Sequence, residues 1–556
     1  MEEKEKLARL RREFRELDAP SHRARLPQEI WVAAPDGVRL RTVVTLPEGE
    51  GPFPTILLRS CYPQAEPDYQ LTAQGYAQRG FAFVYQFCRG TGGSEGAWEP
   101  NIHEREDGLA AARWLAAQPF AGPCGYLGCS YLAFTGWIMA DALPDKFKTL
   151  YLTHYGTDRF ASAYQNGLFR HDILTGWAMD NAGFPVKADY LASCRHRPQF
   201  TVDEDLWGGR LGWYRDWITH ADPHDPYWNE GLWGQLRDIP SRLALPVYIG
   251  SGWYDHHLGS TVRTYLALPP HTRAKSVLRI GAWNHNFEPC VDGKPQRHLE
   301  NSDTASAFRW FRRLLIQGQV PKGGVELYNI GADRWEHFDG LPGAGAKTRE
   351  LFLSCPDRSL TPRAPQRQAP LRYRYDPDDP VPSHGGDSLF TTRQEVGSLP
   401  QPAPGWRPDV LSFVSEPLAA PLHLCGEITA ELEVASDCPD TAFTAKLMEA
   451  APDGTARNIR GGATTLAYRD AGGAEQPYRP GQRVRATIRM WLVSWTVPAG
   501  CRLRLDVSSS NFPEYAAHPN RAGAWARQTG ADVARQTLFG GRLLLPLGEE
   551  REDPPT

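Results

Sequence analysis

The chain has 556 residues and a formal net charge of −4, and 41% of its residues are hydrophobic and 23% are charged. This length predicts several domains, and this composition is typical of a soluble globular protein. The nearly balanced charge argues against nucleic-acid partners and against a polybasic membrane-binding patch. No apolar run approaches the ~18 residues of a membrane span, and residues 1–18 lack the apolar core of a signal peptide.

Cysteine usage points to a reducing compartment. The ten cysteines contain no Cys-x-x-Cys pair. A chain of this length does not need disulfides to be stable, so we expect reduced thiols and a cytoplasmic protein.

Residues 1–25 predict an amphipathic N-terminal helix, because Leu7, Leu10, Phe14 and Leu17 recur at helical spacing. We expect this helix to dock onto its own domain. A contact with a second copy is the alternative, so the oligomeric state stays open.

Two segments, 26–144 and 241–345, alternate short apolar runs with helical stretches, which predicts a doubly wound α/β sheet with helices on both faces. A β-hairpin is expected at the start, around Pro35, Asp36 and Gly37. Between the two segments, residues 145–240 are rich in Trp, Tyr, His and Asp and have no clear strand pattern. We expect them to form a helical cap over the carboxyl edge of the sheet. Within the α/β segments, we expect the apolar runs to form buried strands of the sheet, at residues 55–59, 81–87, 125–129, 245–250 and 276–281.

Residues 346–550 change in character. Alternating polar and apolar residues and turn sequences predict an all-β sandwich, with a proline-rich loop region over 356–410.

Ser130 lies at a predicted strand-to-helix corner in the stretch GYLGCSYLAFT, residues 125–135. Such a serine is either a helix cap or a nucleophile held at the carboxyl edge of the sheet. Two later strand ends supply the partners that an activated serine needs. Asp255 follows the run at 245–250, and His285 follows the run at 276–281. The chain order serine, carboxylate, histidine is that of α/β-hydrolases.

Several motifs, in order, resemble those of the family that contains cocaine esterases, α-amino-acid ester hydrolases and Xaa-Pro dipeptidyl-peptidases. GCSYLA is similar to the family's serine motif, GWYD to its acid motif and WNH to its histidine motif. RSCY resembles the motif that carries an oxyanion-binding tyrosine, and CRGTGGSEG resembles the family's Arg-Gly-x-Gly-x-Ser-x-Gly turn. These motifs lie at 128–133, 252–255, 283–285, 59–62 and 88–96.

The resemblance implies an α/β-hydrolase with a helical cap, followed by a jelly-roll domain of the galactose-binding type. It implies that Ser130 is the nucleophile, His285 its base and Asp255 the orienting acid. The hydroxyl of Tyr62 and the backbone N–H of Tyr131 are then the expected oxyanion donors.

Trp253, His256, His257 and Trp283 flank the acid and histidine motifs, and we expect them to line the substrate pocket. We expect no metal, because adjacent histidines such as His256 and His257 should point apart and no third ligand is evident. No cofactor is implied.

The predicted function is a serine hydrolase that cleaves esters or amides of small molecules, or of a short peptide, through an acyl-enzyme. A Xaa-Pro dipeptidyl-peptidase or an acyltransferase is an alternative. A dipeptidyl-peptidase needs a carboxylate for the substrate's amino group, and Asp172, Asp180 or Asp189 are candidates. A further alternative is an inactive hydrolase whose jelly roll binds glycans.

Overall fold

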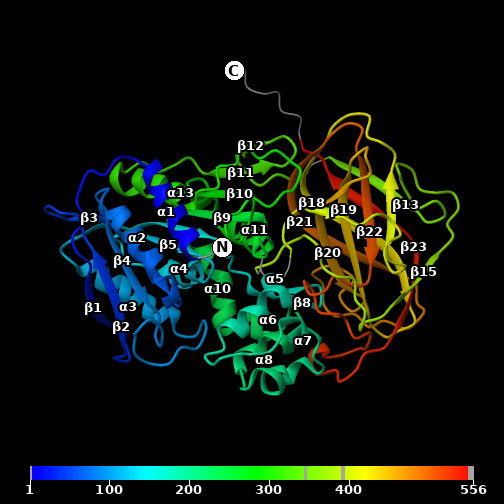
Figure 1. Ribbon diagram of the computed structural model, residues 1–556, viewed down its shortest axis with the longest axis horizontal. Helices are drawn as coiled ribbons and strands as arrows, with labels where there is room; N and C mark the ends of the chain where they lie inside the picture. Colours follow the sequence, from blue (N-terminus) through cyan, green and yellow to red (C-terminus); the bar gives the residue numbers. More distant parts are fainter. Residues whose placement is uncertain (1–2, 344–346, 390–392, 394, 549–556) are drawn as a thin grey trace.

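The structure is a computed structural model that describes residues 3–343, 347–389, 393 and 395–548. Two β-rich regions lie side by side, and the N-terminal α/β region and the C-terminal β-domain occupy opposite ends of the long axis (Figure 1). The helices of the cap lie along the lower side of the view, where the two regions meet (Figure 1). Among the helices that the structure describes, none combines the length and apolar character of a membrane-spanning segment.

A mixed sheet forms the N-terminal region, and ten of its strands fall within the described residues. Neighbouring strands from β4 to β11 run parallel, whereas β1, β2 and β12 add antiparallel pairs at the two ends. In spatial order the strands are β1 (Gln28–Ala33), β2 (Arg39–Thr45), β4 (Ala82–Phe87), β3 (Phe53–Ser60), β5 (Ala121–Cys129), β6 (Phe147–Thr153), β9 (Val247–Tyr254), β10 (Val277–Asn284), β11 (Gly324–Asn329) and β12 (Arg334–Phe338).

The parallel strands are nearly continuous apolar runs because both faces of the sheet are covered. Every residue of β4 and of β9 is buried. Helices pack on the two faces, and their sequences have the small and apolar residues that close packing requires. The longer of these helices are α2 (Glu66–Ala77), α3 (Glu104–Ala117), α4 (Tyr131–Trp137), α11 (Leu258–Ala267) and α13 (Asp303–Phe311).

One strand was missed in the sequence. Residues 147–153 were expected to belong to the helical cap, but they form β6, which pairs in parallel with β5 and with β9. The expected start of the cap at residue 145 is therefore too early. In the run FKTLYLT the polar pair Lys148 and Thr149 interrupts the apolar residues, and this hid a central strand that is buried from Thr149 to Thr153.

The cap that follows β6 is mainly helical, as expected, with one small hairpin, β7 (Tyr164–Gln165) and β8 (Leu168–Phe169). Its helices connect β6 to β9. They are α5 (Arg159–Ala163), α6 (His171–Asp180), α7 (Tyr190–Arg195), α8 (Gly212–Thr219), α9 (Pro226–Asn229) and α10 (Gly231–Arg242).

The C-terminal region is all-β. Its longest strands are antiparallel neighbours, and β18 lies between β21 and β23. The strands are β13 (Thr348–Ser354), β14 (Ser359–Thr361), β15 (Leu371–Tyr375), β16 (Pro400–Gln401), β17 (Leu411–Ser415), β18 (Leu422–Ser436), β19 (Ala442–Ala450), β20 (Ala456–Thr465), β21 (Val484–Val497), β22 (Arg502–Ser508) and β23 (Ala534–Pro546).

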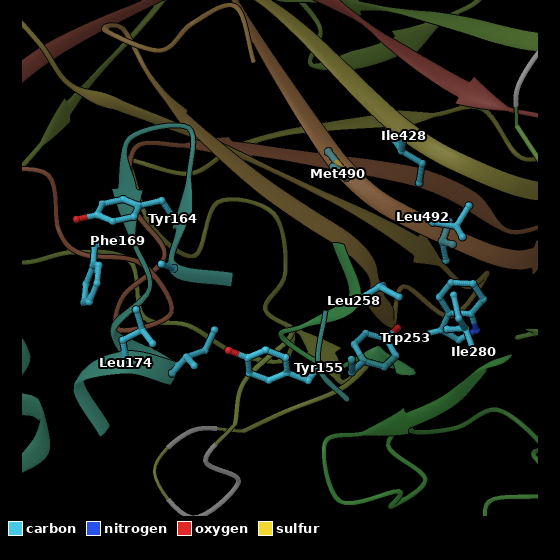
Figure 2. Close-up of a cluster of buried hydrophobic side chains, with 14 of the residues drawn as sticks. Tyr155, Tyr164, Phe169, Leu174, Trp253, Leu258, Ile280, Ile428, Met490 and Leu492 are labelled. Atoms are coloured by element: carbon cyan, nitrogen blue, oxygen red, sulfur yellow. The ribbon is translucent and has the colours of Figure 1, made fainter. Parts of the chain in front are cut away.

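The hydrophobic core runs without interruption through the three regions. Figure 2 shows part of this cluster, from Leu174 of the cap through Leu258 of α11 to Met490 and Leu492 of β21. The β-domain is thus packed against the hydrolase sheet rather than tethered to it. This packing makes it available as a wall of the site.

The N-terminal helix α1 (Glu3–Glu16) docks on its own chain. Phe14 is 6% exposed and its ring lies edge-on to Tyr76 of α2, with a centroid separation of 5.9 Å. Arg79 donates to the backbone carbonyl of Phe14. The close approach depends on Gly75, because a Cβ atom there would lie 2.4 Å from the Phe14 ring.

We therefore predict that Gly75→Ala loosens α1. Alanine normally stabilises a helix by up to about 1 kcal/mol relative to glycine, but here the added methyl group collides with Phe14. Limited proteolysis should cut the Lys- and Arg-rich α1 faster in the variant than in the wild type.

Gly212→Ala is the matched control, because Gly212 also lies in a helix and a Cβ there would meet no atom within 4 Å. Equal cleavage rates for wild type, Gly75→Ala and Gly212→Ala would contradict the predicted steric role.

Candidate active site

Ser130 occupies a sharp corner between β5 and α4. Its φ of 57° and ψ of −128° lie outside the usual regions for a non-glycine residue, and such strain is typical of functional corners. A Cβ on Gly128 would lie 2.2 Å from the carbonyl oxygen of Leu132, so the turn requires glycine there. The Ser130 side chain makes no capping bond with α4. The Ser130 side chain therefore does not cap the helix, and the helix-cap alternative is not supported.

A chain of hydrogen bonds joins Ser130 to His285 and Asp255. The Nε2 atom of His285 lies 2.9 Å from Ser130 Oγ, and its Nδ1 atom lies 2.9 Å from Asp255 Oδ1. Ser130, Asp255 and His285 follow β5, β9 and β10, and the structure brings all three together at one edge of the sheet. His285 is 7% exposed and Asp255 is fully buried.

Asp255 is held as a carboxylate. Burial by itself favours the neutral acid, but the hydrogen bond with His285 and the neighbouring histidine rings favour the charged form more strongly. Together they hold the pKa of Asp255 well below its usual value. Ser251 donates its hydroxyl to Oδ2 at 2.7 Å, and the backbone N–H of His257 donates to Oδ1 at 3.2 Å.

Three further histidines surround this chain. His154, His256 and His257 are all buried, and burial lowers the pKa of His154 to about 3 and those of the other two well below the usual range. They are therefore neutral near pH 7. They surround Asp255 and His285 with buried, uncharged rings and add no positive charge.

The expected separation of two of these histidines is wrong. The rings of His256 and His257 lie only 4.2 Å apart, because the loop after β9 turns both side chains toward the sheet edge. Potential ligand atoms of Asp255, His256 and His285 lie within 4.8 Å of one another. However, both ring nitrogens of His285 already contact Asp255 and Ser130, so a metal there would have to break that chain.

Two tyrosines lie next to the serine corner. The hydroxyl oxygen of Tyr62 accepts a hydrogen bond from Trp177 Nε1 at 3.1 Å, which leaves its own proton available. Burial raises the pKa of Tyr62 well above its usual value, so it stays a donor. Tyr131 is the first residue of α4, where backbone N–H groups have no acceptor within the helix. Its side chain is fixed elsewhere, donating to Glu104 at 3.1 Å.

A small cavity of about 30 Å³ opens beside Ser130. His256 and His257 line it, as expected. Trp253 and Trp283 do not, and that expectation is corrected: Trp253 points into the core and donates to the carbonyl of Tyr328, and Trp283 packs beneath the loop after β10. The cavity is lined by Asn101, Ser130, Tyr131, Tyr155, Arg159, Ile173, Leu174, Trp177, Trp217, His256, His257 and Leu389.

The three cap carboxylates considered for amine binding lie elsewhere. Asp172 pairs with Arg170 at 2.9 Å, Asp180 pairs with Arg393 at 2.6 Å, and Asp189 caps α7 by accepting from the N–H of Ala192. None of the three lines the cavity.

Sequence reasoning missed several residues of the site. Arg159, Trp177 and Trp217 come from the cap, whose helices bring them to the cavity only after folding. Ser251 lies inside β9, where a buried polar residue was a usable signal. His154 follows β6, so recognising that strand would have placed it at the same edge as Ser130.

Two family models match this chain. The model of X-Pro dipeptidyl-peptidase (S15 family) matches residues 36–286, and that of the X-Pro dipeptidyl-peptidase C-terminal non-catalytic domain matches residues 318–537. Both matches support the resemblance of this chain to the family that contains cocaine esterases and X-Pro dipeptidyl-peptidases. The chain is 27% identical to a cocaine esterase from Rhodococcus sp. (strain MB1 Bresler) over 543 residues, which cover 90% of this chain and 93% of that relative.

Solved structures agree with the fold. An α-amino acid ester hydrolase superposes with a TM-score of 0.81 at 21% identity, covering 96% of this chain and 98% of that one. An aminopeptidase from a marine sediment archaeon superposes with a TM-score of 0.76 at 20% identity, covering 95% and 98%. The expected architecture, an α/β-hydrolase followed by an all-β domain, is confirmed. Together with the family matches, these similarities identify the protein as a serine hydrolase of the esterase and peptidase class.

The buried histidines predict acid lability. His154 has a folded-state pKa of about 3 against a reference value of 6.5. Between these values the unfolded chain binds a proton that the folded protein does not, so stability falls as the pH drops, by about 1.4 kcal/mol per pH unit. We predict that His154→Asn, which tolerates the positive φ of 52°, shows a smaller fall in melting temperature from pH 7 to pH 5.5 than the wild type.

His224→Asn, at an exposed position, is the control and should show the wild-type fall. If His154→Asn lost as much melting temperature as the wild type, His154 would not be neutral in the folded protein.

Proposed function

We propose that this serine hydrolase cleaves carboxylic esters through an acyl-enzyme, with Ser130 as nucleophile, His285 as general base and Asp255 as the orienting acid. The observation that carries the proposal is the unbroken chain of 2.9 Å contacts from Asp255 through His285 to Ser130. A serine hydroxyl is a poor nucleophile until a base removes its proton, and this chain supplies that base.

In the acylation step Ser130 Oγ attacks the ester carbonyl while Nε2 of His285 takes the hydroxyl proton. Asp255 accepts from Nδ1, which keeps the lone pair on Nε2 and stabilises the imidazolium that forms. The imidazolium then protonates the departing alkoxide. In the second half, water takes the place of the alcohol, and His285 again acts as base to release the acid.

The negative charge that develops on the carbonyl oxygen needs donors already in place. We assign this role to the hydroxyl of Tyr62 and the backbone N–H of Tyr131; the rings of these two residues are neighbours, with centroids 6.2 Å apart. The hydrogen bond from Trp177 fixes the Tyr62 hydroxyl, so little reorganisation is needed as charge develops.

An esterase fits the cavity better than a Xaa-Pro dipeptidyl-peptidase. A peptidase of that kind must hold a free ammonium group, for which a carboxylate is the natural partner. The described residues that line the cavity include no carboxylate. The β-domain adds Leu389 to this lining and so shapes the pocket. An acyltransferase would use the same acyl-enzyme with a different acceptor, and no described feature favours it.

We predict that Ser130→Ala loses hydrolysis of a simple aryl ester and labelling by a fluorophosphonate. Losses on the order of 10⁶ in kcat are known when a member of such a unit is removed. Cys129→Ala is the matched control for the neighbouring thiol, whose sulfur faces His154 at 3.6 Å, and it should keep both signals.

The wild type should also hydrolyse the aryl ester faster than a Xaa-Pro-nitroanilide. Full esterase activity in Ser130→Ala would contradict the proposed mechanism. A wild-type preference for the nitroanilide would favour the peptidase alternative.

We predict that Tyr62→Phe lowers kcat by about 10²–10³, the usual cost of one oxyanion donor. KM should change less, because the lost bond forms mainly in the transition state. Tyr69→Phe is the control: it removes a nearby buried hydroxyl that is hydrogen-bonded to Ser60 and that we do not assign to the oxyanion site. Equal kcat values for the two variants would remove Tyr62 from the oxyanion site.

A further inference from the structure

A buried cation lies in the wall of the cavity beside Ser130. Arg159, the first residue of α5, is 8% exposed. Its guanidinium stacks over Trp217 of α8 at 4.7 Å and over Trp233 of α10 at 5.5 Å from the ring centroids. These two aromatic faces hold the group in a fixed position and partly offset its positive charge. They leave its N–H edges without a counter-ion.

No carboxylate neutralises Arg159 within the described part of the chain. The adjacent Asp158 is used otherwise: it accepts from the N–H of Ala161 at 3.1 Å and pairs with Arg263 at 2.6 Å. Residues 390–392 and 394, next in sequence to the cavity residue Leu389, are Phe, Thr, Thr and Gln and carry no acid. Burying a guanidinium without a counter-charge costs free energy, so we expect Arg159 to have an anionic partner.

Two donors in the same wall lack hydrogen-bond partners. The Nε atom of Arg159 and the hydroxyl of Tyr155 are both buried and bond to no atom of the described protein. Tyr155 is 4% exposed, and Figure 2 shows its hydroxyl pointing toward Leu174, another cavity residue. Since more than about nine in ten buried polar groups are satisfied in proteins, two orphaned donors beside one cavity indicate a ligand with acceptor atoms.

The other titratable groups at this cavity do not compete for such a ligand. His256 and His257 are neutral, because burial lowers the pKa of each well below its usual value. Burial raises the pKa of Tyr155 and outweighs the opposing effects of the charge and side chain of the neighbouring Arg159, so the Tyr155 hydroxyl keeps its proton. The only full charge contributed by the described lining residues is therefore positive.

We propose that Arg159, with the hydroxyl of Tyr155, binds a carboxylate carried by the ester substrate, so that the preferred substrates are esters with a free carboxylate group. This inference rests on the proposed esterase function. The cavity is lined by both Arg159 and Ser130, so a carboxylate bound to Arg159 lies in the same cavity as the reacting serine. The carboxylate only binds; the ester carbonyl is the group that reacts at Ser130.

The alternative is that Arg159 serves only to pack the cap, through its two tryptophan contacts. The two roles differ in substrate selectivity. A packing residue changes stability and turnover of all esters together, whereas a carboxylate-binding residue changes the ratio between charged and neutral esters of the same shape.

The first test uses the wild-type enzyme and two matched pairs of esters. Methyl hemiglutarate is compared with its neutral carbamoyl analogue, which places the charge on the acyl side. 3-Acetoxybenzoate is compared with 3-acetoxybenzamide, which places it on the leaving group. We expect kcat/KM for the charged member to exceed that of the neutral member by about 10- to 100-fold in one pair, as for a hydrogen bond to a charged group. A ratio near one or below in both pairs would overturn the proposal.

The second test is Arg159→Gln. The ratio of kcat/KM for the charged over the neutral ester should fall to near one. Arg210→Gln makes the same change in net charge at an exposed cap position and should keep the wild-type ratio. An unchanged ratio in a folded Arg159→Gln enzyme would overturn the proposal, as would an equal fall in Arg210→Gln.

Labelling of Ser130 by a fluorophosphonate separates the two hypotheses. If the wild type is not labelled and cleaves none of the four esters, the proposed function fails. If it is labelled and cleaves esters without preferring the charged member of either pair, only the assignment of Arg159 fails.

Discussion

The site depends on parallel strands ending at one edge of a sheet. Strands β3, β5, β6, β9 and β10 are consecutive neighbours, and the residues just beyond their carboxyl ends are Tyr62, Ser130, His154, Asp255 and His285. Because parallel strands end at a common edge, residues from five distant parts of the chain meet there, and no long loop is needed to bring them together. The 2.9 Å contacts of His285 follow from this register.

Burial makes these contacts effective. Asp255 is removed from water yet held ionised by donors from Ser251, His257 and His285, so its charge acts on the imidazole in a low-dielectric setting. The neutral histidines around it exclude water without competing as cations. The same burial has a cost, since a chain that hides several uncharged histidines is destabilised by acid.

The cap and the β-domain decide what reaches Ser130. The sheet edge supplies the reacting groups, while α5, α6 and α8 supply most of the remaining wall and the β-domain supplies Leu389. This protein and its structural relatives share the fold at about 20% identity. Here the wall carries a cation, Arg159, and no described carboxylate.

The sequence by itself determined the parts that depend on local pattern. Apolar runs with glycine corners predicted most strands, and the residues following three of those runs predicted the set of Ser130, Asp255 and His285. It failed at β6, whose mixed polar pattern hid a central strand, and at Trp253 and Trp283, which were assigned to the pocket because they neighbour its motifs. Only the tertiary structure decided which side chains line the cavity. Whether a side chain on β9 or β10 faces the core or the pocket depends on what packs over it, and the residues that do so, such as Arg159, come from helices far away in the chain.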